Sequence, residues 1–291
     1  MNIGGKTRIL GVIGNPIEHT VSPVIHNNLA AALGEDFAYV ALKVEEEGLE
    51  DAIYGAYALS LLGLNVTVPH KSACMKYLKD IDPLAKKIGA VNTLVRVEGG
   101  YKGYNTDMPG LLRAMEHDGV DIKGKDVIIL GAGGVARAVS ILMTSSGAKH
   151  TYILNRTLSK AQAIVSEIEE DESLKGRISA MDIKDYKNLP GEDYICIQAT
   201  NVGMHPDTGS AVIEDAEFYK KISFGYDLVY NPLETKFMKL CKNAGADAFC
   251  GLRMLLYQGV IAFEYWTGHI VSDELAEEVY GKMIEYMNEQ R

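Results

Sequence analysis

Short apolar runs alternate with longer amphipathic segments over roughly the first hundred residues of the chain. Strands are predicted where the run is short and ends in turn-forming residues, at 7–14, 37–44 and 64–69. Helices are predicted between them, at 22–34 and 49–63. Alternating strands and helices are typical of a sheet that is covered by helices.

A second α/β pattern follows residue 108. It comprises predicted helices and strands at 109–119, 125–148, 150–156, 158–170, 193–204 and 222–230. The residues from 254 onward read as helices that return to pack on the first domain. The sequence therefore predicts an α/β protein of two domains: a substrate and catalytic domain, 1–108 with 253–291, and a Rossmann-type dinucleotide-binding domain, 109–252.

Composition narrows the possible partners. The chain has 291 residues and a formal net charge of −10, which argues against nucleic acid or an anionic membrane as a partner, because both require a basic surface. The four cysteines form no C-x-x-C pair and do not cluster with histidines, so no metal site is expected. The first residues lack a signal-peptide pattern, and we expect a cytoplasmic protein.

A glycine-rich turn predicts a dinucleotide site. In "VIILGAGGVARA", Gly131, Gly133 and Ala136 follow an apolar strand and open a helix in the G-x-G-x-x-A pattern. The first glycine allows a tight turn, the second lets the backbone approach a pyrophosphate, and the alanine permits close packing. The helix N-terminus supplies N–H donors to the phosphates.

The next predicted strand favours NADP over NAD as the cofactor. NAD sites usually carry an acidic residue at the end of this strand, to hold the ribose 2′-hydroxyl. Here the strand ends in Asn155 and Arg156, with Lys160 close behind. A guanidinium can bind a 2′-phosphate in a fork and stack on adenine. The alternative is a solvated cationic loop without a binding role.

Several polar residues of the first domain lie at predicted strand ends, where they suit a small polyhydroxylated acid: Thr20, Ser22, Asn65, Thr67, Lys71, Asn92 and Asp107. Lys71 lies where a helix is expected to begin, at the positive end of the helix dipole. A cation there costs roughly 0.3–1 kcal/mol, so its presence indicates a role in the cleft. The alternatives to a functional role are that Lys71 is a solvated surface residue and that Asp107 and Ser22 only cap helices.

The whole chain resembles the shikimate dehydrogenase family. The resemblance rests on the order and spacing of "GNPIEHTVSPVIHN", "NVTVPHK", "GAVNTL", "GYNTD", "GAGGVARA", "NRTLSKA", "YDLVYNP" and "MLLYQG". It implies an enzyme that interconverts 3-dehydroshikimate and shikimate with NADP, in the pathway to aromatic amino acids. Family members are monomers or homodimers, and the chain does not decide between these states.

The resemblance also implies roles for single residues. Lys71 and Asp107 would form the catalytic acid–base pair, and Thr20 and Ser22 would hold the substrate carboxylate. The residues expected around the ring hydroxyls are Asn65, Thr67, Asn92, Tyr230 and Gln258. The residues expected to contact the cofactor are Gly131, Ala132, Gly133, Gly134, Val135, Ala136, Asn155, Arg156, Thr157, Lys160, Leu228, Gly251 and Met254.

Some positions depart from the commonest family pattern. Thr20 replaces a usual serine, and Arg253 stands where glycine is frequent, near the expected nicotinamide end. The stretches "ATNVGMHP" and "QGVIAFEYWTG" look more like the quinate/shikimate subgroup. Quinate, an aminoshikimate-type cyclic acid, or a non-catalytic NADP-binding sensor therefore remain alternatives. The histidines near these motifs, His19, His26 and His70, are interpreted as local hydrogen-bonding or surface groups.

Overall fold

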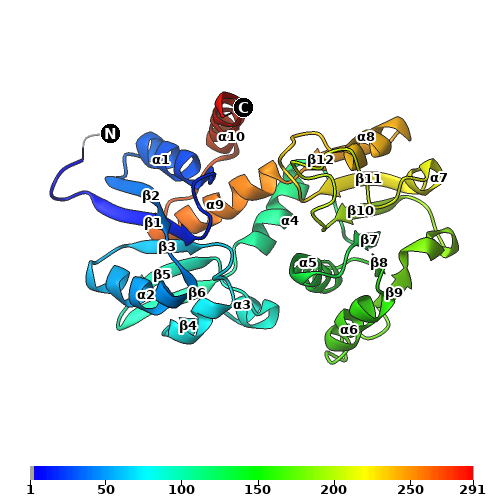
Figure 1. Ribbon diagram of the computed structural model, residues 1–291, viewed down its shortest axis with the longest axis horizontal. Helices are drawn as coiled ribbons and strands as arrows, with labels where there is room; N and C mark the ends of the chain where they lie inside the picture. Colours follow the sequence, from blue (N-terminus) through cyan, green and yellow to red (C-terminus); the bar gives the residue numbers. More distant parts are fainter. Residues whose placement is uncertain (1–2, 291) are drawn as a thin grey trace. The chain divides into compact units, whose positions relative to one another are not determined.

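The computed structural model describes residues 3–290, which divide into two compact units (Figure 1). Unit 1 contains the described residues up to Leu112 and from Leu255 onward, and unit 2 is Arg113–Met254. Both breaks between the units fall inside helices, α4 (Asp107–His117) and α9 (Leu252–Thr267). The chain therefore has no linker composition at either break, and the breaks lie slightly beyond the predicted boundaries after residues 108 and 252.

Unit 1 is built on a mixed sheet of six strands in the order β2-β1-β3-β5-β6-β4. The strands are β1 (Arg8–Gly14), β2 (Phe37–Lys43), β3 (Gly63–Val66), β4 (Asp80–Ile81), β5 (Thr93–Val97) and β6 (Gly100–Tyr104). β1 pairs in parallel with β2 and β3, whereas β5 runs antiparallel to β3 and β6. Strands β5 and β6 form a hairpin at Gly99 and Gly100, and both glycines have positive φ.

Helices cover both faces of this sheet. On one face, α2 (Leu49–Ala58) and the short 3₁₀ helix η2 (Ala73–Tyr77) bury Leu49, Ile53 and Cys74 against the strands. The other helical segments of unit 1 are α1 (Ser22–Leu33), α3 (Pro83–Ile88), α10 (Asp273–Glu289) and the 3₁₀ turn η1 (Glu46–Gly48). Gly34 ends α1 in the left-handed conformation, which glycine adopts without strain.

The C-terminal helices return to unit 1, as predicted. The indole of Trp266 on α9 donates a hydrogen bond to the carbonyl oxygen of Leu94 at 2.9 Å. Phe263 packs against Phe37 of β2, with ring centroids 5.6 Å apart. Helix α10 lies beside α1 (Figure 1), and the Lys282 ammonium there donates to the Asn28 side chain at 3.0 Å. Apolar burial of α9 thus ties the end of the chain to its beginning.

Unit 2 contains a sheet of six parallel strands in the order β12-β11-β10-β7-β8-β9. The strands are β7 (Asp126–Leu130), β8 (His150–Asn155), β9 (Ile178–Asp182), β10 (Tyr194–Gln198), β11 (Ile222–Asp227) and β12 (Asp247–Cys250). The chain order reverses between β7 and β10. This is the strand order of a doubly wound nucleotide-binding fold, with its switch point at the carboxyl end of β7.

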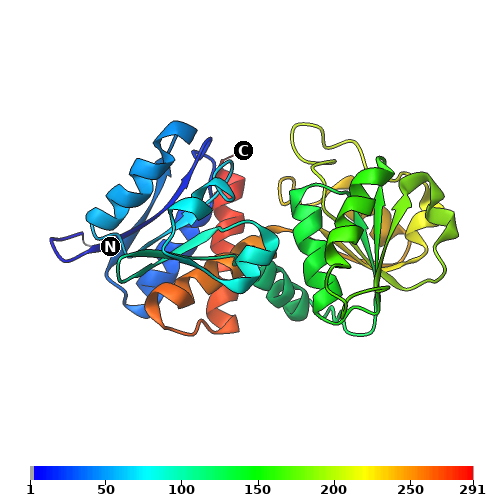
Figure 2. The ribbon, with the colours of Figure 1, turned by 90° about the horizontal axis from the view of Figure 1, so that it is seen from below.

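Two helical layers cover the unit 2 sheet (Figure 2). Its helical segments are α5 (Gly134–Ser145), α6 (Leu158–Ile168), η3 (Ile183–Asn188), α7 (Ala216–Tyr219) and α8 (Lys236–Asn243). One core cluster contains Ile141 of α5 and Ile164 of α6, and the other contains Phe218 of α7 and Phe237 of α8. Because the central strands β7 and β10 are buried on both faces, they read as nearly continuous apolar runs.

The predicted α/β fold class is confirmed, although the sequence did not indicate β4, β9 or β12. These are short or edge strands whose burial is only partial, so their apolar pattern is weak. Within residues 3–290, no helix has the length and apolarity that a membrane crossing requires. The four cysteines are free thiols, and all but Cys250 are buried.

Candidate active site

One edge of the unit 1 sheet gathers the polar residues that the sequence singled out. The carboxyl ends of β1, β3 and β6 lie at this edge with the amino end of β5, because β5 runs antiparallel to its two neighbours. The segments at these strand ends carry the hydroxyls of Thr20 and Ser22, the ammonium of Lys71, the amide of Asn92 and the carboxylate of Asp107.

Lys71 and Asp107 form an ion pair at this edge. The Lys71 Nζ atom lies 2.7 Å from Asp107 Oδ2, and the two side chains are 32% and 18% exposed, so the pair is reachable from solvent. The main chain fixes Lys71, since its carbonyl oxygen accepts a hydrogen bond from the Val91 N–H at 2.8 Å. Lys71 lies in a turn before the short η2 rather than in the first turn of an α-helix, so the predicted dipole penalty is weaker than supposed.

Asn92 holds the second oxygen of the Asp107 carboxylate. Its Nδ2 atom donates to Asp107 Oδ1 at 2.9 Å and to Thr106 Oγ1 at 3.0 Å, and Asn92 is buried. Its Oδ1 atom accepts from the Thr106 N–H at 2.7 Å. The Gln258 amide of α9 is a weaker acceptor for the same Nδ2, at 3.4 Å. The carboxylate is therefore oriented on both oxygens, with the ammonium on one and the amide on the other.

A second set of hydrogen bonds extends from Asn92 towards Thr20 and Ser22. Asn65 Nδ2 donates to the Asn92 carbonyl oxygen at 3.1 Å, and its Oδ1 atom accepts from the Tyr39 hydroxyl at 2.6 Å. Burial raises the pKa of Tyr39 well above its usual value, and a hydrogen bond with Ser22 partly offsets this. Thr20 Oγ1 lies 3.2 Å from Ser22 Oγ. The structure thus connects most of the predicted substrate residues through one buried polar network.

The capping alternatives for Asp107 and Ser22 are wrong. Asn105 caps α4 instead, because its Oδ1 atom accepts from the Met108 N–H at 3.2 Å. The Asp107 carboxylate is consequently available to Lys71 and Asn92. At α1 the N-cap position is Val21, without a side-chain capping bond, and Ser22 is already helical. Both side chains are left for the polar network rather than for helix termination.

Two of the predicted substrate residues stand apart from this network. Thr67 is half-buried after β3, and within residues 3–290 its hydroxyl forms no hydrogen bond with the other substrate residues, although its backbone N–H donates to the Ile13 carbonyl oxygen at 2.9 Å. Tyr230 belongs to unit 2, whereas the network lies in unit 1. The roles of both residues at the substrate stay predictions.

The three histidines differ from one another more than the sequence indicated. His19 is exposed, and the buried His70 lies with Nε2 2.7 Å from the Val44 carbonyl oxygen. The interpretation of His26 as a surface group is wrong. Its ring is fully buried and stacks on Tyr39 with centroids 4.2 Å apart, and among the described residues neither ring nitrogen has a partner at good hydrogen-bond geometry. Burial lowers the pKa of His26 to about 3, although the Asn65 side chain opposes the fall, so the ring is neutral.

The glycine turn of unit 2 lies at the switch point of its sheet. Gly131 follows β7 with φ of 113°, a conformation that favours glycine, and a Cβ there would lie 2.7 Å from Thr200 Cγ2. A Cβ on Gly133 or Gly134 would meet no atom within 4 Å, so the space above this turn is open. Helix α5 starts at Gly134 without a side-chain cap, which leaves its first N–H groups for a phosphate.

The loop after β8 presents cationic groups to solvent. The Asn155 side chain donates to the Thr157 carbonyl oxygen at 2.9 Å and so shapes the loop. Arg156, Thr157 and Lys160 are exposed, and neither cation forms an ion pair with a residue in the described range 3–290. Thr157 occupies the N-cap position of α6 without a side-chain capping bond. Guanidinium, hydroxyl and ammonium groups are therefore free to receive an anion.

The predicted contacts with the other end of the cofactor lie after β11 and β12. Gly251 packs so closely on Leu228 that a Cβ would lie 2.3 Å from the Leu228 carbonyl oxygen. Arg253, the departure from the family pattern, is engaged: its Nε atom lies 2.9 Å from Asp118 Oδ1. Burial raises the pKa of Asp118, and the positive charge of Arg253 opposes that rise. The half-buried Met254 lies beside Arg253 on α9.

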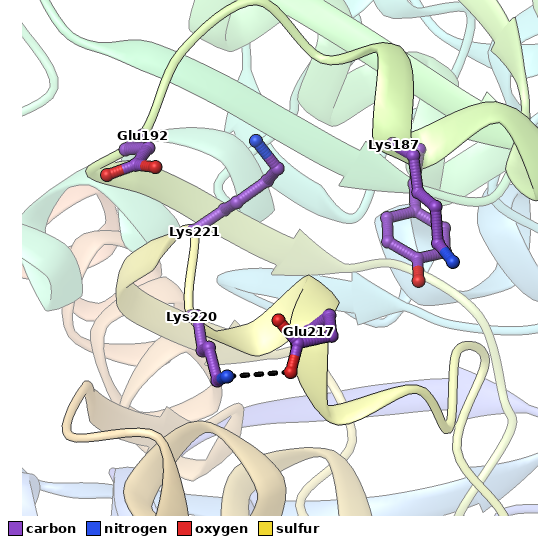
Figure 3. A pocket seen from close by; sticks show the side chains of 6 residues that line it. Lys187, Glu192, Glu217, Lys220 and Lys221 are labelled. Atoms are coloured by element: carbon purple, nitrogen blue, oxygen red, sulfur yellow. Dashed lines mark hydrogen bonds and ion pairs between the residues drawn. The ribbon is translucent and has the colours of Figure 1, made fainter.

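A surface pocket of unit 2 contains none of the predicted site residues. Its lining is charged, with Lys187, Glu192, Glu217, Lys220 and Lys221 as labelled side chains, and Lys220 bonds Glu217 at 2.6 Å (Figure 3). Glu192 and Lys221 precede β10 and β11, so the pocket opens at the amino edge of the sheet. Ligands of doubly wound folds bind at the carboxyl edge instead. Among the described residues no cluster of three or more His, Cys, Asp or Glu side chains is arranged to hold a metal ion.

Comparison with known proteins identifies the family. A model of the shikimate dehydrogenase substrate binding domain matches residues 12–94, a shikimate / quinate 5-dehydrogenase model matches 113–203, and a shikimate 5'-dehydrogenase C-terminal domain model matches 251–279. A curated relative, the shikimate dehydrogenase (NADP(+)) of Carboxydothermus hydrogenoformans, is 42% identical over 92% of this chain and 94% of its own. The chain belongs to the shikimate dehydrogenase family.

Solved shikimate dehydrogenases have the same fold. The shikimate 5-dehydrogenase of Listeria monocytogenes, in complex with shikimate and NAD, superposes with a TM-score of 0.87 at 34% identity, covering 96% of this chain and 98% of its own. A shikimate dehydrogenase in complex with NADP+ gives 0.86 at 39% identity, with 97% of each chain covered. The family membership that the motifs indicated is confirmed.

Sequence reasoning missed several members of this shikimate dehydrogenase network. Tyr39, Thr93 and Thr106 are buried and bond the predicted residues Asn65 and Asn92. Thr106 lies within the "NTD" stretch and was within reach of motif reasoning. Tyr39 lies in a strand whose alternation predicts core packing, and Thr93 begins the next strand. Nothing in their local sequence distinguishes these two residues from ordinary strand residues.

Proposed function

We propose that this protein is an NADP-dependent shikimate dehydrogenase, which interconverts 3-dehydroshikimate and shikimate by hydride transfer. The observation that carries the proposal is the Lys71–Asp107 pair at the edge of the unit 1 sheet. Lys71 Nζ lies 2.7 Å from Asp107 Oδ2, and Asn92 orients the carboxylate by donating to its Oδ1 atom at 2.9 Å. A non-catalytic sensor would have no use for a solvent-reachable ammonium whose carboxylate partner is fixed on both oxygens. The relatives named shikimate dehydrogenase (NADP(+)) support the same activity.

Lys71 is the proton donor in the reducing direction. Its ammonium would give a proton to the carbonyl oxygen of the substrate as the hydride arrives at carbon, and would receive it back in the reverse reaction. Asp107 keeps the lysine in place by accepting a hydrogen bond from its ammonium, while Asn92 prevents the carboxylate from rotating away. Thr20 and Ser22 would bind the substrate carboxylate with their adjacent hydroxyls.

The unit 2 turn fits a dinucleotide. The positive φ of Gly131, the open space above Gly133 and the uncapped start of α5 are the features that a pyrophosphate requires. When bound, the nicotinamide supplies or accepts the hydride. Leu228, Gly251 and Met254 are the residues proposed at that end, and Ala132, Gly134, Val135 and Ala136 line the turn.

NADP is favoured over NAD by the loop after β8. Arg156 and Lys160 are exposed cations, and the Thr157 hydroxyl lies between them in sequence, so together they suit the 2′-phosphate. The Listeria relative was solved with NAD, whereas the second solved relative was in complex with NADP+. Selectivity is therefore a property to measure on this chain, and the loop argues for the phosphate-bearing cofactor.

The exact substrate, the location and the oligomeric state are less closely defined than the reaction. The substrate is a small molecule, and quinate or an aminoshikimate-type acid is an alternative to shikimate that the comparisons do not favour. The product serves the biosynthesis of aromatic amino acids. A cytoplasmic location and a monomeric or homodimeric state stay predictions from the sequence. The roles of Thr67, Tyr230 and Gln258 at the ring hydroxyls are part of this proposal.

The direct test is a substrate panel. Purified protein is incubated with shikimate, quinate or an aminoshikimate, each with NADP or NAD, and reduced cofactor is followed by its absorbance. We expect the highest kcat/KM with shikimate and NADP, and detectable but slower oxidation of quinate. No oxidation of any acid with either cofactor would contradict the proposed activity.

A further inference from the structure

Unit 2 buries a carboxylate that the proposed reaction does not use. Asp227 is the last residue of β11 and is fully buried. Its Oδ2 atom accepts from the Thr235 hydroxyl at 2.6 Å, and its Oδ1 atom accepts from the Gln198 amide at 3.1 Å and the Val229 N–H at 3.0 Å. No lysine or arginine of the described chain forms an ion pair with it. Burying a carboxylate without a cationic partner costs free energy, so the position of Asp227 needs a structural or functional reason.

The three donors come from three different segments at the carboxyl edge of the sheet. Gln198 ends β10, and its side chain also donates to the Val202 carbonyl oxygen at 3.1 Å and accepts from the Thr200 N–H at 2.6 Å. Thr235 caps α8, because its hydroxyl oxygen accepts from the Met238 N–H at 3.3 Å. The third segment begins immediately after Asp227. One carboxylate thus joins a strand end, a loop and a helix start.

That loop, Leu228–Tyr230, is clamped on both sides. The Leu228 N–H donates to the Gln198 carbonyl oxygen at 3.0 Å, and the Val229 carbonyl oxygen accepts from the Gly251 N–H at 3.1 Å. Gly251 approaches Leu228 so closely that no side chain would fit between them. The loop is therefore held by Asp227 from one side and by the residue that follows β12 from the other. It carries two of the residues proposed at the cofactor and the substrate.

We propose that Asp227 is a positioning residue for the cofactor: its carboxylate holds the Leu228–Tyr230 loop in the conformation that receives the nicotinamide end of NADP. This inference rests on the proposed function. A carboxylate suits the task better than an amide, because all of its lone pairs accept hydrogen bonds and it can serve three donors at once.

Asp227 is also the group in this cluster that titrates near neutrality. Burial raises the pKa of Asp227 to about 6, although the bonds from Thr235, Val229 and Gln198 oppose the rise. The titratable groups that face it are Cys196 of β10, Tyr219 of α7 and Cys241 of α8, and burial raises the pKa of all three. They stay neutral in the range where Asp227 changes charge. Protonation of Asp227 converts an acceptor into a donor, which weakens its hold on the loop.

The test compares Asp227→Ala and Asp227→Asn with the wild type and with Thr235→Ser, a control that keeps the donating hydroxyl. NADPH affinity is measured by fluorescence titration, and hydrogen exchange is followed in peptides that contain Val229. We expect Asp227→Ala to weaken NADPH binding about tenfold or more and to speed exchange of the loop, because hydrogen bonds to a charged acceptor are lost. Thr235→Ser should behave as the wild type.

Asp227→Asn isolates the charge. It keeps an acceptor towards Val229 and mimics the protonated acid, so we expect a smaller loss of affinity at about pH 7.5 and convergence with the wild type at about pH 5. The cofactor phosphate titrates equally in both proteins, so the difference between them belongs to Asp227. Parallel loss of affinity in both proteins on acidification would overturn the proposal, as would an Asp227→Ala variant that melts lower yet binds NADPH like the wild type.

These measurements stand apart from turnover. If Asp227→Ala does not fold, the Asp227→Asn comparison still decides the matter. A wild type that binds NADPH but oxidises no acid would contradict the proposed activity alone, whereas normal turnover with unchanged binding in the Asp227 variants would contradict the positioning role alone.

Discussion

The two units build their sites in opposite ways. In unit 1 the proposed chemistry depends on side chains from widely separated segments, since Lys71, Asp107 and Asn92 meet only because three strand ends share one edge of a sheet. In unit 2 the proposed cofactor turn is six consecutive residues, 131–136, and the groups proposed to bind the phosphates are main-chain N–H donors. A side-chain site fails when one group is removed, whereas a main-chain site fails when the backbone is bent.

Removing the ammonium of Lys71 from the side-chain site of unit 1 should produce the largest loss of activity. Lys71→Ala should reduce kcat with shikimate by roughly 10²–10⁴, the usual contribution of a positioned acid or base. NADPH affinity should hardly change, because the predicted cofactor residues belong to unit 2. Steady-state kinetics and a binding titration measure the two effects.

A matched control for Lys71 is available on the adjacent 3₁₀ helix. Lys76 is exposed there and lies over the Tyr77 ring, 4.7 Å from its centroid, so Lys76→Ala removes a nearby lysine without touching the ion pair. It should keep wild-type kcat. A Lys71→Ala variant that turned over shikimate at nearly the wild-type rate would remove the acid–base role from this residue.

Arg156 tests the proposed cofactor site of unit 2. There, the main chain is proposed to bind the pyrophosphate, and the Arg156 side chain is proposed to bind the 2′-phosphate. A charge-assisted hydrogen bond contributes about 1.5–3 kcal/mol, reduced here by exposure, so Arg156→Ala should raise KM for NADP by about tenfold and by less than about a hundredfold. KM for NAD should stay nearly unchanged, because its ribose hydroxyl does not need the guanidinium. The exposed Lys175→Ala is the control. A wild type that prefers NAD would show that the loop is not a phosphate site.

The same contrast explains what the sequence revealed. The glycine turn was predicted from spacing and physical principle, because its residues are adjacent and each has a stated backbone reason. The Lys71–Asp107 pair came from the family resemblance, since residues 36 positions apart carry no local sign that they meet. Tyr39 and His26 were missed for a related reason. Their roles depend on which side chains the fold brings around them, and a strand or helix pattern predicts burial but not a partner.

Thr20 bears on substrate choice within the side-chain site. Its hydroxyl bonds Ser22, while its methyl group takes space beside the expected substrate carboxylate. Thr20→Ser keeps the hydroxyl and removes the methyl, so it should change the quinate-to-shikimate ratio of kcat/KM by a factor that corresponds to about 1–3 kcal/mol at most. Equal effects on both acids would mean that the methyl group does not face the ring carbon by which they differ.

The smallest expected effect is the contribution of His26 to the pH dependence of the free energy of unfolding. It is compared with the contribution of Asp227 in unit 2. Its folded-state pKa is about 3 against an ordinary 6.5, because burial disfavours the imidazolium. The unfolded chain therefore binds more protons between these values, so stability is complete above about pH 6.5 and falls as the pH drops. This single group should lower the free energy of unfolding by about 1 kcal/mol between about pH 6.5 and 5.5.

Asp227 contributes with the opposite sign, because its folded pKa is raised: the native state gains stability as the pH falls from about 6 towards 3.8. Chemical denaturation at several pH values should therefore show a weaker acid dependence in His26→Phe than in the wild type, and a stronger one in Asp227→Asn. His19→Asn, which removes an exposed imidazole, is the control. If the free energy of unfolding of His26→Phe depended on pH as in the wild type, the His26 imidazole would not make unit 1 sensitive to acid. The ring would then have to be hydrogen-bonded to a proton acceptor in solution.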